Sequence, residues 1–217
     1  MNGILPFIFS SLPSTGHGPA ILLDRDGVIN ERIHPGYVTR WDEFRFVAGI
    51  REAIAGLAEW GLPIIVVSNQ AGVGKGLVKG ASLSDLTNRF VTEVTNSRGR
   101  IDAVYYCQHT PEENCACRKP RTGLLTRAAE DWRLDLSRSV LIGDSANDLE
   151  AARAANCMSI FLASEAHHES TRADELGRIA DAMIQDAAEI PKTVQRLLGS
   201  DRQKARLCAA LRESSND

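Results

Sequence analysis

Short apolar runs alternate with stretches of helical spacing along most of this chain, and this alternation restricts the folds open to it. The run at 63–67, PIIVV, is β-branched and ends at a polar Ser-Asn pair. Between 49 and 60, apolar residues recur every three or four positions, which is the spacing of one helix face. Strands separated by helices form βαβ units, which assemble into a parallel sheet with helices on both faces. We therefore predict an α/β fold with a Rossmann-like parallel sheet.

The same pattern predicts one folded domain at residues 20–198, with an N-terminal extension at 1–19 and a C-terminal tail at 199–217. Pro6 interrupts the mildly apolar start of the chain, which lacks the basic segment of a signal peptide, so we interpret this start as a loose leader. The predicted strands are 20–23, 63–67, 103–107, 139–142, 159–163 and 182–184, and the predicted helices are 49–60, 82–96, 124–132, 149–155 and 190–198.

The overall charge and the length of the apolar runs argue against some classes of partner. A net charge of −3 provides no strong field for nucleic acid or an anionic membrane surface. No apolar run approaches the roughly 20 residues of a membrane-spanning helix. We expect a cytoplasmic monomer that binds neither nucleic acid nor a membrane. In that reducing compartment, clustered cysteines bind metal or react more often than they form disulfides.

Polar side chains follow three of the predicted strands at the point where each strand ends. Asp24, Ser68 and Asp144 occupy these positions. In an open parallel sheet, ligands bind outside the carboxyl ends of the strands, so three such residues can converge on one crevice. Taken singly, an aspartate after a strand is more often a turn former or a helix cap. The coincidence of all three with Lys119 favours a shared functional site.

The residue types at these positions suit the transfer of a phosphoryl group. Asp24 and Asp26 are so close that they need a cation to remain ionised together, and Asp144 adds a third acid. Carboxylates and a main-chain carbonyl suit Mg²⁺, which also takes a phosphate oxygen. Ser68 can donate a hydrogen bond to the phosphate, and Lys119 can neutralise it. One aspartate can attack phosphorus while the second transfers protons.

The segment 107–120, CQHTPEENCACRKP, contains three of the five cysteines of the chain and a histidine. A disulfide within this short loop would leave an odd cysteine and give the histidine no role. A chance grouping of small buried residues is a second interpretation. The third, which we favour, is a closed tetrahedral zinc site that folds the loop and does not catalyse. Its ligands would be Cys107, His109, Cys115 and Cys117.

Four motifs together resemble those of the haloacid-dehalogenase-like phosphatases. They are LLDRDGV, VVSN, the lysine of CRKP and GDSANDLEAA, and the resemblance spans residues 20–198. A narrower similarity is to the D-glycero-D-manno-heptose-1,7-bisphosphate 7-phosphatases and the related histidinol-phosphate phosphatases. It rests on DRDGVIN, GYV followed by FRF, SNQAGVGKG, YYCQH and CACRKP. In that family, the C-x-H and C-x-C segments bind structural zinc.

The resemblance implies a role for each matching position. Asp24 would be the nucleophile and Asp26 the general acid and base, while Ser68 and Lys119 would hold the transferring phosphoryl group. Catalytic Mg²⁺ would bind Asp24, the main-chain carbonyl of Asp26 and Asp144. The substrate-binding positions would be Gly36, Tyr37, Asn69, Gln70 and Arg118.

Two residues need separate comment beside the family motifs, and the lengths of two chain segments limit the size of any inserted domain. Many family members carry Lys or Arg directly after the aspartate of the fourth motif, whereas Ser145 stands here. For Arg25 we interpret the side chain as solvated. Neither 27–67 nor 69–118 has room for a folded cap domain of typical size, so we expect a capless enzyme whose cysteine loop forms one wall of the site.

The expected protein is a Mg-dependent phosphomonoester hydrolase of carbohydrate metabolism that forms an aspartyl-phosphate intermediate. Its partner would be a small phosphorylated metabolite, with D-glycero-D-manno-heptose 1,7-bisphosphate as the expected substrate. Histidinol phosphate is the alternative within the family. A catalytically inactive, zinc-stabilised interaction module is the alternative from another class, and the complete set of acids, serine and lysine argues against it.

Overall fold

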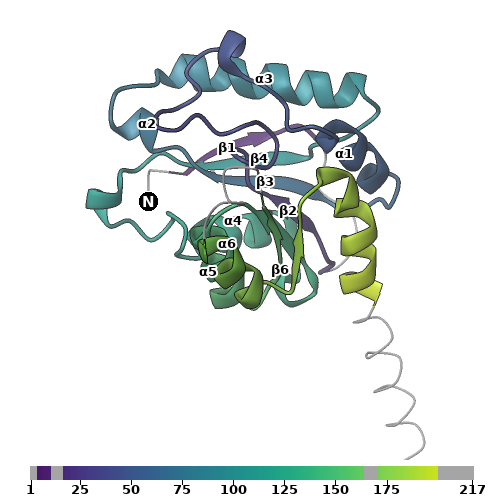
Figure 1. The fold of residues 1–217 in the computed structure, drawn as a ribbon. Coiled ribbons are helices and arrows are strands. Elements are labelled where there is room, and N and C mark those ends of the chain that lie inside the picture. Colours follow the sequence, from purple (N-terminus) through teal and green to yellow (C-terminus); the bar gives the residue numbers. More distant parts are fainter. Residues whose placement is uncertain (1–3, 11–16, 164–170, 200–217) are drawn as a thin grey trace, which may run out of the picture.

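A sheet of seven strands, in the order β1-β4-β3-β2-β5-β6-β7, forms the centre of the computed structural model of this protein (Figure 1). The structure describes residues 4–10, 17–163 and 171–199. Neighbouring strands are parallel except β1 and β4, so the predicted α/β fold with a parallel sheet is confirmed. The strands are β1 (Ile4–Ile8), β2 (Ile21–Leu23), β3 (Ile64–Asn69), β4 (Ala103–Cys107), β5 (Val140–Gly143), β6 (Met158–Leu162) and β7 (Ala182–Ile184).

Helices connect the parallel strands close to where the sequence predicts them. They are α1 (Ile50–Ala58), α2 (Ala71–Gly74), α3 (Gly80–Asn96), α4 (Gly123–Trp132), α5 (Ala146–Ala154) and α6 (Thr171–Ile179), and residues 190–199 are also helical. Short 3₁₀ turns occur at Trp41–Glu43, Pro111–Glu113, Leu136–Arg138 and Ala187–Glu189. The sequence pattern predicts neither α2 nor α6. At four residues, α2 is too short to show a helical period.

The alternation of side chains in the central strands divides the core between the two faces of the sheet. In β3, Ile64 and Val66 pack on the face that α1, α3 and the helix at 190–199 cover. Ile65 and Val67 pack on the opposite face, against α4 and α5. All four side chains are fully buried, as expected for a parallel strand covered on both sides.

The start of the chain forms part of the sheet. Residues 4–8 are strand β1, which pairs antiparallel with β4 in a register that places Ile4 opposite Cys107. Leu5 and Phe7 pack against the core on the α1 and α3 side. Pro6 is tolerated because β1 is an edge strand. The expectation of a loose leader is therefore wrong for residues 4–8.

The segments between the site-bearing strands contain no inserted domain. Between β2 and β3, all residues are described, and they form loops, one 3₁₀ turn and α1. Between β3 and β4, likewise fully described, they form α2, α3 and loops. The predicted tail lies outside the described residues from position 200 onward, and the domain limits at 20 and 198 stay a prediction. None of the helices in the described ranges is long and apolar enough to cross a membrane.

Candidate active site

The carboxyl ends of β2, β3 and β5 lie together because β2 pairs in parallel with both of the other strands. Asp24 directly follows β2, Ser68 lies near the end of β3, and Asp144 directly follows β5. All three side chains are buried. Next to them is a cavity of about 230 Å³, whose lining includes Asp24, Asp26, Ser68 and Lys119. The fold thus gathers residues that are far apart in the sequence.

Lys119 links two acids of this site. Its Nζ lies 3.0 Å from Asp24 Oδ1 and 2.5 Å from Asp148 Oδ1, and it donates a hydrogen bond to the Val67 carbonyl at 2.7 Å. Burial alone would lower the pKa of Lys119, but the charges of Asp148 and Asp24 outweigh burial and raise this pKa. The lysine is therefore a fixed positive charge beside the carboxylate of Asp24.

An asparagine at the end of β3 sets the position of Lys119. Asn69 Nδ2 donates to the carbonyl of Lys119 at 2.9 Å, and the Lys119 N–H donates to Asn69 Oδ1 at 3.0 Å. This reciprocal pairing joins β3 to the loop that follows the cysteine cluster. Asn69 also lines the cavity, so its amide positions the lysine from within the expected substrate site.

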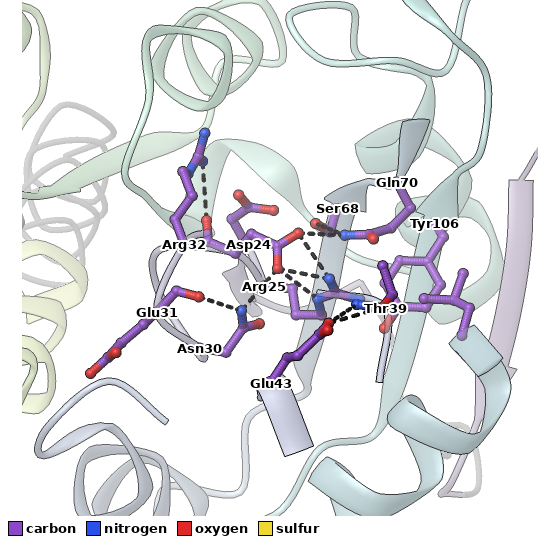
Figure 2. A network of polar contacts seen from close by, with 12 residues as sticks. Asp24, Arg25, Asn30, Glu31, Arg32, Thr39, Glu43, Ser68, Gln70 and Tyr106 are labelled. Atoms are coloured by element: carbon purple, nitrogen blue, oxygen red, sulfur yellow. Dashed lines mark hydrogen bonds and ion pairs between the residues drawn. The ribbon is translucent and has the colours of Figure 1, made fainter. Parts of the chain in front are cut away.

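A network of donors surrounds the carboxylate of Asp26 (Figure 2). Arg25 Nη2 lies 2.7 Å from Asp26 Oδ1 and 2.9 Å from Oδ2. Asn30 Nδ2 donates to Oδ1 at 3.0 Å, and Gln70 Nε2 donates to Oδ2 at 2.7 Å. Burial alone would raise the pKa of Asp26, but the charge of Arg25 and these hydrogen bonds lower it. Asp26 is thus held ionised and oriented.

Arg25 is buried, so the interpretation of a solvated side chain is wrong. The residue is 1% exposed, and its guanidinium carbon lies 5.8 Å from the centre of the Tyr106 ring. A guanidinium always carries its charge and matches a carboxylate through paired N–H groups, so the burial is compensated by the pairing with Asp26. The sequence gives no direct signal of this burial, because DRDG alone does not specify where the arginine points.

Buried oxygens at the ends of β2 and β5 provide a place for Mg²⁺. Carboxylate oxygens of Asp24, Asp144 and Asp148 all lie within 4.8 Å of one another. Burial raises the pKa of Asp24 and of Asp144, and the nearby Asp148 raises both further. Such acids ionise together only beside a cation, so the donor set fits a hard divalent ion. Asp148 is a further oxygen near this place that the predicted ligand set does not include.

Gly27 allows Asp144 to approach the loop after β2. Its φ is +93°, and a Cβ at this position would lie 1.9 Å from Asp144 Oδ2. Any other residue would therefore strain the backbone here, and its side chain would also displace the carboxylate of Asp144. Only glycine is compatible with this close approach of Asp144 to the loop after β2.

We expect Gly27→Ala to weaken Mg²⁺ binding by at least about 10-fold, because the methyl group displaces Asp144 and a lost charge-assisted contact costs ~1.5–3 kcal/mol. Isothermal calorimetry with MgCl₂ measures this effect. Gly80→Ala is the matched control, since a Cβ there meets nothing within 4 Å. Equal Mg²⁺ affinities in the two variants would contradict the packing argument.

The four side chains of the cysteine cluster point toward a common centre. Cys107 Sγ lies 3.6 Å from Cys115 Sγ and 3.2 Å from Cys117 Sγ. His109 Nδ1 lies 3.6 Å from Cys107 Sγ and 3.2 Å from Cys117 Sγ. A tetrahedral zinc ion with usual bond lengths separates its ligand atoms by about 3.5–3.8 Å, so the cluster fits zinc with slight contraction.

The distances between the sulfur atoms exclude a disulfide bond within the cluster in this structure. Cys107, Cys115 and Cys117 are all free, and their sulfurs are much farther apart than the ~2.05 Å of a disulfide bond. The chance interpretation does not explain why the histidine nitrogen joins the three sulfurs within 4.8 Å. The geometry favours a metal site whose four protein ligands leave no open position for water.

The cysteine loop presents two cations to the cavity. Arg118 and Lys119 directly follow the last cysteine, and both line the cavity. Arg118 Nη1 donates to the carbonyl of His109 at 3.4 Å, which connects the guanidinium to the cluster. Arg121 instead donates to the Cys115 carbonyl at 2.7 Å and does not line the cavity.

Four of the five predicted substrate-binding residues line the cavity, namely Gly36, Tyr37, Asn69 and Arg118. Gln70 does not. It is 3% exposed and donates to Asp26 and to Ser68 Oγ, a position suited to orienting the acid. The cavity lining also includes Arg32, which the sequence reasoning missed, and Ser145. Arg32 lies outside the quoted motifs, so no local pattern marks it.

The chain is similar in sequence to a family model and to several proteins that share one name. A family model described as HAD-hydrolase-like matches residues 116–190. The D-glycero-beta-D-manno-heptose-1,7-bisphosphate 7-phosphatase of Photorhabdus laumondii is 32% identical over 184 residues, covering 82% of this chain and 95% of that protein. The protein of the same name from Escherichia coli K12 is 32% identical over 185 residues, covering 82% and 94%.

Solved structures show the same architecture. The D,D-heptose 1,7-bisphosphate phosphatase from B. bronchiseptica, complexed with magnesium and phosphate, matches with a TM-score of 0.74 and 28% identity. The match covers 82% of this chain and 98% of that one. A putative HAD-like phosphatase from Mesorhizobium loti matches with a TM-score of 0.75 at 23% identity, which supports the fold alone.

Proposed function

Because this chain belongs to the family of the D-glycero-beta-D-manno-heptose-1,7-bisphosphate 7-phosphatases, within the HAD-like phosphatases, we propose that it removes one phosphate from a sugar bisphosphate, most specifically a heptose 1,7-bisphosphate. The observation that carries the proposal is the convergence of Asp24, Ser68 and Lys119 on one cavity, beside the acids Asp144 and Asp148. The set contains a nucleophile, a hydroxyl that can donate a hydrogen bond to phosphate, a fixed positive charge and oxygen ligands for a metal ion.

In the first step, a carboxylate oxygen of Asp24 attacks the phosphorus, and the bond from phosphorus to the sugar oxygen breaks. Lys119 lies 3.0 Å from Asp24 and is placed to neutralise the phosphoryl oxygens, to which Ser68 donates a hydrogen bond. Asp26 takes up a proton from solvent as the substrate phosphate enters, and it gives this proton to the departing sugar oxygen. The entering phosphate raises the pKa of Asp26 through like-charge repulsion, which favours the protonated form needed here.

In the second step, water attacks the phosphorus of the aspartyl-phosphate. Asp26 takes a proton from this water, the bond to Asp24 breaks, and inorganic phosphate leaves. Arg25, Asn30 and Gln70 orient Asp26 and lower its pKa, which suits the role of a base.

Bound Mg²⁺ would neutralise charge that develops on the phosphoryl oxygens. Asp24, Asp144 and the Asp26 carbonyl would hold this ion, with Asp148 as a further nearby oxygen donor. Zinc is proposed at Cys107, His109, Cys115 and Cys117, where it would fix the loop that carries Arg118 and Lys119. The spacing of the four ligand atoms supports this second proposal.

A phosphate-release assay with Mg²⁺ tests the proposed function. The panel contains a heptose 1,7-bisphosphate, a hexose bisphosphate, a sugar monophosphate and histidinol phosphate. We expect the highest kcat/KM with the heptose bisphosphate. Preference for histidinol phosphate would favour the alternative substrate, and no release from any compound would favour an inactive, zinc-stabilised interaction module.

We expect Arg118→Ala to lower kcat/KM for the bisphosphate by at least about 10-fold and to change that for a small monophosphate much less. The guanidinium lines the cavity next to Lys119, so it can meet the anionic group of the substrate that is not transferred. Loss of one charge-assisted hydrogen bond costs ~1.5–3 kcal/mol.

Arg127→Ala is the matched control for this measurement, because Arg127 pairs with Asp131 on the surface of α4. An equal loss on both substrates in Arg118→Ala would mean that Arg118 only supports the loop. The cationic amine of histidinol phosphate would be repelled by Arg118, so activity on that compound should not fall in the variant.

A further inference from the structure

Arg32 contacts two of the oxygens that are proposed to hold Mg²⁺. Its Nη2 donates to Asp144 Oδ1 at 2.6 Å and to the main-chain carbonyl of Asp26 at 3.1 Å. Figure 2 marks the contact between the Arg32 guanidinium and the main-chain oxygen with a dashed line. One nitrogen therefore bridges a carboxylate and a carbonyl, where a cation bound by both would also lie.

The guanidinium and the metal ion cannot occupy this position together. Mg²⁺ binds oxygens at about 2.0–2.1 Å and requires near-octahedral geometry. A nitrogen within hydrogen-bond distance of both oxygens would stand where the ion and its remaining ligands must lie. Binding of the ion therefore requires Arg32 to move away from Asp144 and from the Asp26 carbonyl.

The Arg32 side chain has room to move away from Asp144. Residues 31–36 form an exposed segment, and the Arg32 side chain is 45% exposed while Asp144 is 2% exposed. Arg32 already lines the cavity with Arg118 and Lys119. Lys119 already contacts Asp24, Asp148 and the Val67 carbonyl, so a second cation in the cavity could share the charge of a phosphate group. A released guanidinium is therefore free to make a paired contact with phosphate oxygens in the cavity.

We propose that Arg32 is an internal cation that occupies the Asp26 carbonyl and Asp144 before Mg²⁺ binds, and that it turns to a phosphate group in the cavity once the ion displaces it. This inference rests on the proposed function. Arg32 would stabilise the metal-free site, where it is the ion-pair partner of Asp144 among the described residues. It would then become a substrate-binding residue in the loaded enzyme.

Calorimetry with MgCl₂ on Mg-free protein that keeps its zinc tests the competition. Arg32→Ala should bind Mg²⁺ about 3- to 10-fold more tightly than the wild type, because the competing contact is lost and the pair is only half-buried. In buffer without Mg²⁺, the same variant should unfold about 2–4 °C lower, since Asp144 loses its partner. Arg89→Ala, which removes a surface pair on α3, should change neither quantity. Unchanged or weaker Mg²⁺ binding in Arg32→Ala would overturn the proposal.

Binding of inorganic phosphate to the Mg-loaded protein tests the second role. Arg32→Ala should bind phosphate roughly 10-fold more weakly than the wild type and Arg89→Ala. Unchanged phosphate affinity would show that Arg32 is a counter-ion only and would overturn the substrate role. Both readouts are equilibrium measurements, so they are separate from the release assay. If the wild type is active on the substrate panel but Arg32→Ala binds Mg²⁺ as tightly as the wild type, the proposed function stands and this inference is rejected.

Discussion

Asp24→Asn is expected to lower phosphate release to below about 1% of the wild-type rate, while the fold and the metal content of the cysteine cluster remain intact. The amide is a poor nucleophile, and loss of a nucleophile removes the covalent route altogether. The substitution keeps the shape of a side chain that is only 5% exposed. Since burial raises the pKa of Asp24, a neutral replacement should not lower the unfolding temperature.

A steady-state phosphate assay and a thermal melt check both parts of this expectation. Asp131→Asn is the control, because Asp131 accepts hydrogen bonds from Tyr105 and Arg127 and does not line the cavity. It should retain activity. Activity of Asp24→Asn above about 1% of wild type would reject covalent catalysis through this residue.

Cys115→Ser is expected to remove zinc and to loosen the loop that carries Lys119. Structural zinc contributes on the order of 10 kcal/mol to folding in small peptides, and in this larger fold its loss should cost at least ~3 kcal/mol of the free energy of unfolding. For a protein of this size, that corresponds to about 6–12 °C in Tm. The displaced Lys119 should also weaken phosphate binding, by roughly 10-fold.

Elemental analysis of protein purified without chelator gives the metal content directly. We expect about one zinc per chain in the wild type and in Cys157→Ala, whose thiol donates to the Ser139 carbonyl away from the cluster. Added Mg²⁺ should not restore Cys115→Ser, because a hard ion does not replace zinc at thiolates. Wild-type protein without zinc would contradict the proposed site.

Local sequence pattern was sufficient to predict the six parallel strands and the polar residues at their ends. The β-branched run at 63–67 and its polar continuation mark both a strand and the position of Ser68, because strand and site residue are adjacent in the chain. The cysteine cluster is likewise contained in a short segment, so spacing alone brings its ligands within reach of one metal. Strand β1 lacked such a signal, since its pairing depends on the free edge of β4.

Side-chain orientation was decided only by tertiary structure. The sequence determined that Asp24, Asp26, Ser68, Lys119 and Asp144 would lie near one edge of the sheet. It did not determine that Arg25 turns inward to Asp26, that Gln70 orients this acid, or that Arg32 bridges to Asp144. The contacts of Gln70 and Arg32 join segments far apart in the chain. The inward turn of Arg25 joins neighbours, but like the other two it depends on burial and charge compensation that exist only after the strands have assembled.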